Sequence, residues 1–507
     1  MNIQEAKTEV KNTVRAYLKK DEAGLSAIPV EKQRPLLLIG PPGIGKTAIM
    51  EQIARELGIG LVSYTITHHT RQSAIGLPYI SHRNYGGKDT AVTEYTMSEI
   101  IASVYEEIER TGNEEGILFL DEINCVSETL APTMLQFLQY KTFGAHRVPD
   151  GYVIVTAGNP PQYNKSVRDL DIVTLDRVRR LDIEEDYKTW KDYARRNGVH
   201  GAILAYLEIR RDHFYHVRTE IEERYFVTAR GWEDLSRILQ VYEDENIPVT
   251  AALVREYLQD PEIASSFADY YLLYRKYSGE YRIADILKGI YPEETAALRN
   301  APFDEKLSLI GLLTDALSTE GRDYCEKKEI QTTLQTWLSE LRMRLKNGEA
   351  QPATEILDAL IGEQKTALKR DTEAKHLSRE DQRIRSRAIR ALEEMKRELP
   401  LSSGEEGDEA GRLFTELRDA FLAREKDRME DAERTSAAIT NSFSFMARTF
   451  GEGQEMVMFL SELTGCESVM KHIADLGNEA YERYSRLLLL KERKEGIRED
   501  ILAVRSW

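Results

Sequence analysis

The chain has 507 residues, enough for several folding units, and its composition (41% hydrophobic, 31% charged) is that of a folded protein, which excludes a disordered chain. A net charge of −17 argues against wrapping nucleic acid or binding anionic membranes through bulk charge. Three widely spaced cysteines indicate neither a disulfide framework nor a zinc pattern and favour a reducing cytoplasm, and no apolar run approaches the ~18 residues that a membrane span requires.

Short apolar runs alternate with helical patterns over the first 185 residues. Residues 3–19 have the spacing of an amphipathic helix. Strands are expected at 35–40, 60–66, 116–120, 151–157 and 179–183, and helices at 46–57, 97–110 and 127–140. Several of the strand candidates are almost continuously apolar, as in parallel strands covered on both faces. The pattern predicts a three-layer α/β domain with a parallel sheet.

Helical patterns dominate the remainder of the chain. Residues 186–300 look mostly helical, and after Pro302 only Pro352 and Pro400 interrupt the amphipathic spacing. The polar, acidic segment PLSSGEEGDEAG has the composition of a linker. The expected organisation is an α/β core with an N-terminal helix at 1–185, a helical lid at 186–300, a helical region at 301–400, a linker at 401–411 and a C-terminal helical region at 412–507.

The strongest motif is GPPGIGKT at residues 40–47, which matches GxxxxGK[ST] between a strand and a helix. Its glycines allow backbone amides to point inward around an anion, and the following helix adds its positive end. Lys46 is expected to reach the β- and γ-phosphates, and Thr47 to ligate Mg²⁺. The nucleotide-binding residues are expected to be Gly40, Pro41, Pro42, Gly43, Ile44, Gly45, Lys46, Thr47 and Ala48.

A second acidic site follows the apolar run ILFL, which ends in Asp121 and Glu122. Two acids at the end of a buried strand are costly unless they point into a site. We expect Asp121 to hold Mg²⁺ and Glu122 to polarise the attacking water as general base.

Two other classes of phosphate-loop protein are disfavoured by their missing motifs. A GTPase would carry NKxD, but the nearest string, NKSV at 164–167, lacks the aspartate. An ABC transporter ATPase would carry LSGGQ before the acidic strand, but the closest string, LSSGE at 401–405, lies in the expected linker.

In order along the chain, GPPGIGKT, LDEIN (120–124), TAGNP (156–160), LDR (175–177) and TAR (228–230) resemble the motifs of AAA+ ATPases, specifically the MoxR-like and magnesium-chelatase-like group. The resemblance covers about residues 20–300. It implies a P-loop AAA+ core with a helical lid, to which this chain adds an all-α C-terminal region.

The same resemblance implies roles for three further residues. Asn159 resembles the sensor-1 residue that helps to orient the attacking water. Arg177 resembles the arginine finger that enters the neighbouring subunit's site, and Arg230 resembles the sensor-2 arginine of the lid. Arg179 and Arg180 are close competitors for the finger role, and Arg168 is a more distant one.

Two segments of the predicted core match family insertions. Residues 63–96, with several glycines, are expected to form a loop or hairpin that faces the ring pore or a partner in the family, and the segment before TAGNP resembles a short hairpin. The loop histidines His68, His69 and His82 lack a completing ligand set, and His213 and His216, spaced i, i+3 in a predicted charged helix, are likewise interpreted as non-metal residues.

The leading hypothesis is therefore a cytoplasmic ATPase that uses ATP and Mg²⁺ in a homo-oligomeric ring, expected to be a hexamer. Its role would be chaperone-like: remodelling, maturing or inserting metal into a protein client, with any von Willebrand A-type partner on another chain. Alternatives are a nucleotide-regulated scaffold with little turnover and a nucleic-acid motor, which the acidic charge disfavours.

Overall fold

The computed structural model describes residues 1–68, 76–143, 145–163, 167, 172–219, 223–292, 298–346, 352–373, 377–399 and 409–486. These residues divide into two compact units. The first contains residues 1–190 and 228–231, and the second contains the rest of the described chain. Most of the expected linker at 401–411 lies outside the described residues; only 409–411 are described, at the start of a helix.

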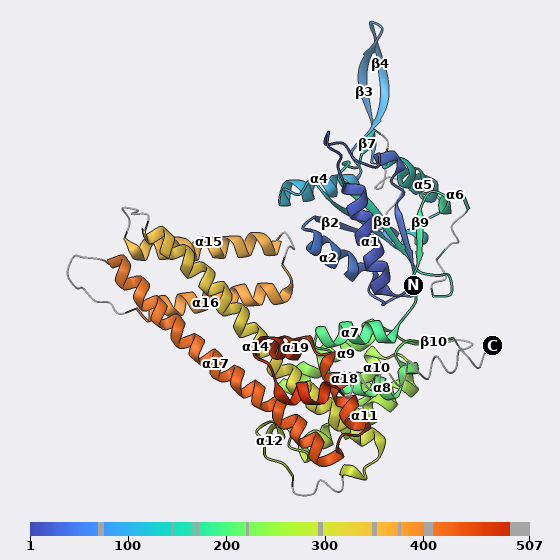
Figure 1. The fold of residues 1–507 in the computed structure, drawn as a ribbon. Coiled ribbons are helices and arrows are strands. Elements are labelled where there is room, and N and C mark those ends of the chain that lie inside the picture. The colour runs from blue at the N-terminus through green and yellow to red at the C-terminus, as the bar shows by residue number, and fades with distance from the viewer. Residues whose placement is uncertain are drawn as a thin grey trace. The chain divides into compact units, whose positions relative to one another are not determined.

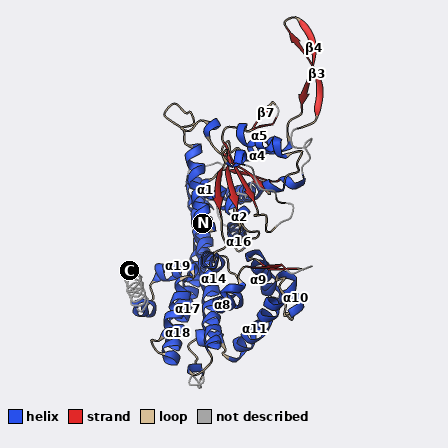
Figure 2. Ribbon diagram, turned by 90° about the vertical axis from the view of Figure 1, so that its right-hand side faces the viewer, coloured by secondary structure: helices blue, strands red, loops and turns tan. Residues whose placement is uncertain are grey.

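Five parallel strands in the order β2–β5–β8–β1–β9 form the sheet of the first unit (Figure 2). Their bounds are β1 (Leu36–Ile39), β2 (Gly60–Thr65), β5 (Gly116–Asp121), β8 (Tyr152–Gly158) and β9 (Arg179–Asp182). The five strands expected from the apolar runs are thus confirmed. β8, although later in the chain than β5, lies between β5 and β1, which brings the ends of these three strands together.

Helices cover both faces of this sheet because its side chains alternate between two cores. Leu36 and Leu38 face the core shared with helices α1 (Ile3–Leu18) and α2 (Lys46–Leu57). Leu37, between them, faces the opposite core with α4 (Glu99–Thr111) and α5 (Ala131–Tyr140). The predicted three-layer α/β architecture is confirmed.

Two hairpins leave the first unit's core, as expected from the sequence. β3 (Pro78–Tyr85) and β4 (Lys88–Tyr95) pair antiparallel and project from the sheet as a long ribbon (Figure 1). The hairpin before β8 is short, with β6 (Thr142–Phe143) paired to β7 (His146–Arg147). The small elements of this unit are η1 (Val30–Lys32), η2 (Ile66–His68), η3 (Ile123–Cys125) and α6 (Ile172–Leu175).

The second unit is almost entirely helical. Its elements are α7 (Tyr187–Arg196, which begins in the first unit), α8 (Gly201–Ile209), η4 (Arg211–His213), β10 (His216–Thr219), β11 (Arg224–Val227), α9 (Ala229–Asp244, which also begins in the first unit), α10 (Ala251–Tyr257), α11 (Pro261–Glu280), α12 (Ile283–Leu287), α14 (Phe303–Lys346), α15 (Ala353–Glu373), α16 (Arg379–Arg397), α17 (Glu409–Phe450), α18 (Gln454–Thr464) and α19 (Glu467–Leu476). Helices α15 and α16 pack on the long helices α14 and α17 through one apolar cluster. Within the described parts of the chain, no helix combines the length and apolar character needed to cross a bilayer.

The helix predicted around His213 and His216 is wrong. His213 ends the 3-10 helix η4, and His216 begins β10, which pairs with β11. The reason is a contact with a distant part of the chain: the indole Nε1 of Trp232 donates to the backbone oxygens of His213 at 3.3 Å and Phe214 at 3.1 Å. A continuing helix would use those two oxygens for its own amides, so the buried tryptophan stabilises the turn instead.

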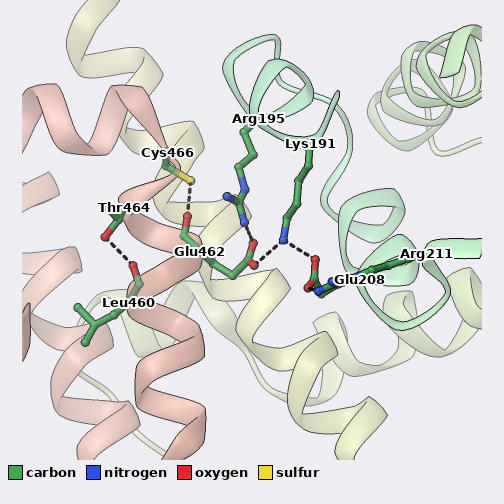
Figure 3. A network of polar contacts seen from close by, with 8 residues as sticks. All are labelled: Lys191, Arg195, Glu208, Arg211, Leu460, Glu462, Thr464 and Cys466. Carbon is green, nitrogen blue, oxygen red and sulfur yellow. Dashed lines mark hydrogen bonds and ion pairs between the residues drawn. The ribbon is translucent and has the colours of Figure 1, made fainter. Parts of the chain in front are cut away.

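Ion pairs join three helices of the second unit that are far apart in sequence (Figure 3). Lys191 of α7 donates to Glu208 of α8 at 2.5 Å and to Glu462 of α18 at 2.7 Å. Arg195, one turn later on α7, also pairs with Glu462. Burial opposes ionisation of Glu208, but the hydrogen bond and charge of Lys191 prevail and lower its pKa. The network fixes α7 against the C-terminal helices.

Candidate functional site

The polar residues predicted to be functional gather at the carboxyl edge of the sheet. The loop 40–45 follows β1 and leads into α2, Asp121 is the last residue of β5, and Asn159 directly follows β8. Because β8 lies between β1 and β5, the three chain segments end side by side. This edge is where ligands bind in open α/β sheets.

The loop has the backbone conformation that its glycines allow. Gly43 has φ of +75° and Gly45 has φ of +97°, in the left-handed region that non-glycine residues rarely adopt. Gly45 is also the N-cap of α2, so Lys46, Thr47 and Ala48 form that helix's first turn. The free amides of this turn and the helix dipole favour an anion at this position.

Lys46 is buried at the centre of the site. Its Nζ donates to the backbone oxygens of Gly40 at 2.7 Å and Pro41 at 2.9 Å, and to Oδ1 of Asn159 at 2.9 Å. All three partners are neutral, and within the described residues the ammonium makes no ion pair. Burial therefore lowers the pKa of Lys46 to about 8, although the charge of Asp121 opposes this effect. A buried cation in contact with neutral groups only is suited to a bound anion.

Thr47 and Asp121 lie together beside Lys46. Oγ1 of Thr47 donates to Oδ2 of Asp121 at 3.2 Å. Hydroxyl and carboxylate oxygens are ligands that Mg²⁺ accepts, and Mg²⁺ is usually held by one or two such groups together with substrate phosphates and water. Within the described ranges, no three His, Cys, Asp or Glu side chains cluster to hold a metal by themselves. The pair thus fits Mg²⁺ bound jointly with phosphate.

Glu122 follows with a strained backbone. Its φ of +58° is left-handed, a conformation that costs a non-glycine residue on the order of 1–3 kcal/mol. Its N–H donates to Oδ1 of Asp121 at 2.9 Å, and its carbonyl accepts the N–H of Cys125 at 2.9 Å. No described residue forms an ion pair with the Glu122 carboxylate. The left-handed residue follows the last residue of β5, and its carboxylate is close enough for its charge to act on Lys46.

Arg230 approaches the same loop from the start of α9. A side chain added at Gly43 would lie 3.1 Å from Cβ of Thr228 and 3.4 Å from Cβ of Arg230, so the backbone of this segment lies directly against the loop. The guanidinium is close enough for its charge to act on Lys46. The structure therefore brings Arg230 to the predicted site, within the first unit.

The arginines considered for the finger role differ in their partners. Arg179 donates to Glu9 at 2.6 Å and to Thr13 at 2.9 Å, and Arg180 donates to Asp182 at 2.8 Å. Arg177, in the turn between α6 and β9, makes no side-chain hydrogen bond or ion pair with the described residues. Arg168, the remaining competitor, lies outside the described residues.

Asn124 also belongs to this edge, although no role was predicted for it. It lies in η3, two residues after Glu122, and its Nδ2 donates to the backbone oxygen of Asn159 at 2.7 Å. Both asparagines line a cleft of about 530 Å³ beside the loop. The signal in the sequence was the position of Asn124 in LDEIN, directly after the acidic pair.

The histidines considered in the sequence lie in different parts of the chain. His82 of β3 contacts Asp89 of β4, with 3.2 Å between Nδ1 and Oδ2. His69 lies outside the described residues, and the side chain of His68 is not described. His213 and His216 belong to the second unit.

The sheet order, the phosphate loop, the acidic pair and the polar residue after β8 together define a P-loop ATPase domain of the AAA+ class. Residues 35–178 match the family model described as AAA domain, dynein-related subfamily. Residues 35–178 therefore have the fold of an AAA domain and are similar to this family over less than half of the chain, and the matched segment includes every predicted site residue except Arg230. No curated protein matches the chain.

Proposed function

We propose that this chain binds ATP with Mg²⁺ at the loop 40–47 and hydrolyses it. The observation that carries the proposal is the environment of Lys46: a buried ammonium with neutral contacts only, next to the Thr47–Asp121 pair. A triphosphate would supply the anion, and its charge would raise the pKa of Lys46 from about 8. An AAA domain also implies nucleotide binding in general.

Each of the site residues would have its own role in ATP hydrolysis. Thr47 and Asp121 would hold Mg²⁺, which when bound neutralises charge on the phosphate oxygens. Glu122, whose carboxylate is not held by an ion pair, would accept the proton of the attacking water. Asn159 would orient that water while it holds Lys46. The products are ADP and inorganic phosphate.

Two arginines would stabilise the charge that develops on the γ-phosphate. Arg230 lies against the loop of its own chain and would act there. Arg177, whose guanidinium makes no hydrogen bond or ion pair with the described residues, would act on the site of a neighbouring copy. This requires a homo-oligomeric ring, and we propose a hexamer. Arg179 and Arg180 are engaged within their own chain, which favours Arg177 for this role.

We further propose that the ring acts on a protein client in the manner of MoxR-like ATPases, by remodelling, maturing or inserting metal into a partner. The order of the five sequence motifs supports this assignment. The second unit, with its two long helices α14 and α17, would carry the surface for such a partner. A von Willebrand A-type protein on another chain would be a suitable partner.

The test is Mg²⁺-dependent ATP turnover of the wild type and Glu122→Gln. The variant keeps the size of the side chain but removes its basicity, so we expect ATP binding to be retained and turnover to fall by about 10²-fold or more. Full turnover of Glu122→Gln would reject the assigned general base. No calorimetric heat on titration of the wild type with ATP and Mg²⁺ would reject the proposal. Binding without turnover in the wild type would support the scaffold hypothesis instead.

A further inference from the structure

The side chain of Asn124 connects the acidic turn to the end of β8. Asn124 is 6% exposed, and its neighbour Ile123 is 5% exposed and packs in the core, so the turn η3 is fixed from both sides. The Nδ2 atom of Asn124 donates to the backbone oxygen of Asn159 at 2.7 Å. The same residue, Asn159, accepts from Lys46 through its side chain. One amide thus lies between the segment that carries Glu122 and the segment that contacts Lys46.

A second observation at the same place concerns Gly158. A Cβ atom added there would lie 2.4 Å from Oδ1, 2.7 Å from Cγ and 3.0 Å from Nδ2 of Asn124. All three distances are below or at the limit of real contacts, so the flat amide lies directly on the backbone of β8. Oδ1 is buried with no hydrogen-bond partner among the described residues. This orphan acceptor lowers stability, so stability alone does not explain this side chain.

We propose that Asn124 is a positioning residue for ATP hydrolysis: its amide sets the position of the Glu122 turn relative to Asn159 and Lys46. The inference rests on the proposed function. Glu122 has a left-handed backbone, and its carboxylate forms no ion pair with the described residues that would hold it in place. Its direction follows from the turn, and the turn is tied to β8 through Asn124. Asn124 acts through Glu122 and does not itself touch the substrate.

The experiment compares Asn124→Ala with wild type for the dissociation constant of ATP with Mg²⁺, KM and kcat. Because the loop 40–47 is unchanged, we expect the dissociation constant to stay within about twofold. The Glu122 carboxylate loses its fixed position, and we expect kcat to fall by about 10-fold to 10²-fold. Gly158→Ala, which forces the amide away without removing it, is expected to lower kcat in the same direction.

A double-variant cycle separates positioning from a structural role. In Glu122→Gln, the carboxylate that Asn124 positions is already absent, so adding Asn124→Ala should lower the residual turnover by less than twofold. The matched control is Asn441→Ala, which removes an amide of the second unit that donates to the backbone oxygen of Leu287 at 2.9 Å. It is expected to lower the melting temperature but leave kcat and KM unchanged.

The outcomes are distinguishable. If the wild type neither binds nor hydrolyses ATP, the proposed function fails. If the wild type is active and Glu122→Gln is not, but Asn124→Ala keeps full kcat, only the positioning role is overturned. Multiplicative effects of Asn124→Ala and Glu122→Gln would also overturn it, because a general loss of folded protein lowers both backgrounds equally.

Discussion

Oγ1 of Thr47 lies 3.2 Å from Oδ2 of Asp121. Thr47 belongs to α2, which follows β1, and Asp121 ends β5, so β8 lies between the two strands that lead to this pair. We expect this pair to set the Mg²⁺ requirement of the proposed ATPase. Asp121→Asn should raise the Mg²⁺ concentration for half-maximal turnover by about 10-fold to 10²-fold, because the variant loses the negative carboxylate that helps to hold the ion. Thr47→Ser keeps the hydroxyl and serves as the control, with less than a threefold change. An unchanged Mg²⁺ dependence in Asp121→Asn would contradict the metal assignment.

The finger role of Arg177 predicts rescue between subunits. Arg177→Ala should lower turnover by about 10³-fold, within the range known for such arginines. Glu122→Gln is inactive for a different reason and still carries Arg177. Mixing the two variants should therefore restore measurable turnover, since an Arg177→Ala site can receive the arginine of a Glu122→Gln neighbour.

The control variants for this experiment are Arg179→Ala and Arg180→Ala. Their guanidinium groups bind Glu9 and Asp182 of the same chain, at partly exposed positions. We expect each variant to lose less than about 1 kcal/mol of stability and to keep its turnover. Rescue of either one by mixing, with Arg177→Ala fully active, would move the finger to that residue.

Because of the buried amino group of Lys141, we expect the folding stability of the first unit to increase with pH in the alkaline range. Lys141 is 4% exposed, its Nζ donates to Oε1 of Gln33 at 3.1 Å, and burial together with the charge of Arg147 lowers its pKa to about 8. The unfolded chain titrates near the ordinary value of 10.5. Between these two values the unfolded state holds the proton and the folded state does not, so stability increases with pH.

The measurement is urea unfolding of wild type and Lys141→Met at pH 7.5, 8.5 and 9.5. The wild type should gain stability relative to the variant by on the order of 1 kcal/mol per pH unit above pH 8. Below pH 7.5 the difference should be constant. A constant difference over the whole range would mean that Lys141 titrates normally. Lys46 contributes with the same sign to both proteins, so it cancels.

In the ion network of Figure 3, we expect removal of the Glu462 charge to lower the stability of the fold more than removal of the Lys191 charge. Glu462 accepts from both Lys191 and Arg195, so Glu462→Gln leaves two buried cations close together, and we expect a loss of about 2 kcal/mol. Lys191→Met leaves Glu462 paired with Arg195 and should cost about 1 kcal/mol. The exposed pair Lys426–Glu430 is the control, with less than about 0.5 kcal/mol for Lys426→Met. Equal losses for all three variants in urea unfolding would contradict the role of the network.

The parts of the fold that could be read from the sequence are those with local causes. The central strands β1, β5 and β8 are short apolar runs because both faces of the sheet are buried there, and the glycines of the phosphate loop occur where left-handed backbone is needed. The hairpin β3–β4 was signalled by the glycines at its turn. Each of these features depends on a few consecutive residues.

The features that were missed depend on partners far away in sequence. The turn between His213 and His216 depends on Trp232 of α9, whose indole donates to the backbone oxygens of His213 and Phe214. The burial of Lys141 depends on Gln33, and the pairing of Arg179 depends on Glu9 of α1. The contact between Asn124 and Asn159 follows from the placement of β8 beside β5, which a single sequence does not specify.

The left-handed backbone of Glu122 means that the natural residue is not the most stable one at this position. Glycine would adopt this φ without penalty, and asparagine would adopt it more readily than glutamate does. Selection for a robust fold alone would therefore have replaced the glutamate. Its presence indicates that the chain tolerates an unfavourable backbone conformation at this one position. A redesign aimed only at stability would replace Glu122 and so remove the carboxylate that the proposed reaction needs.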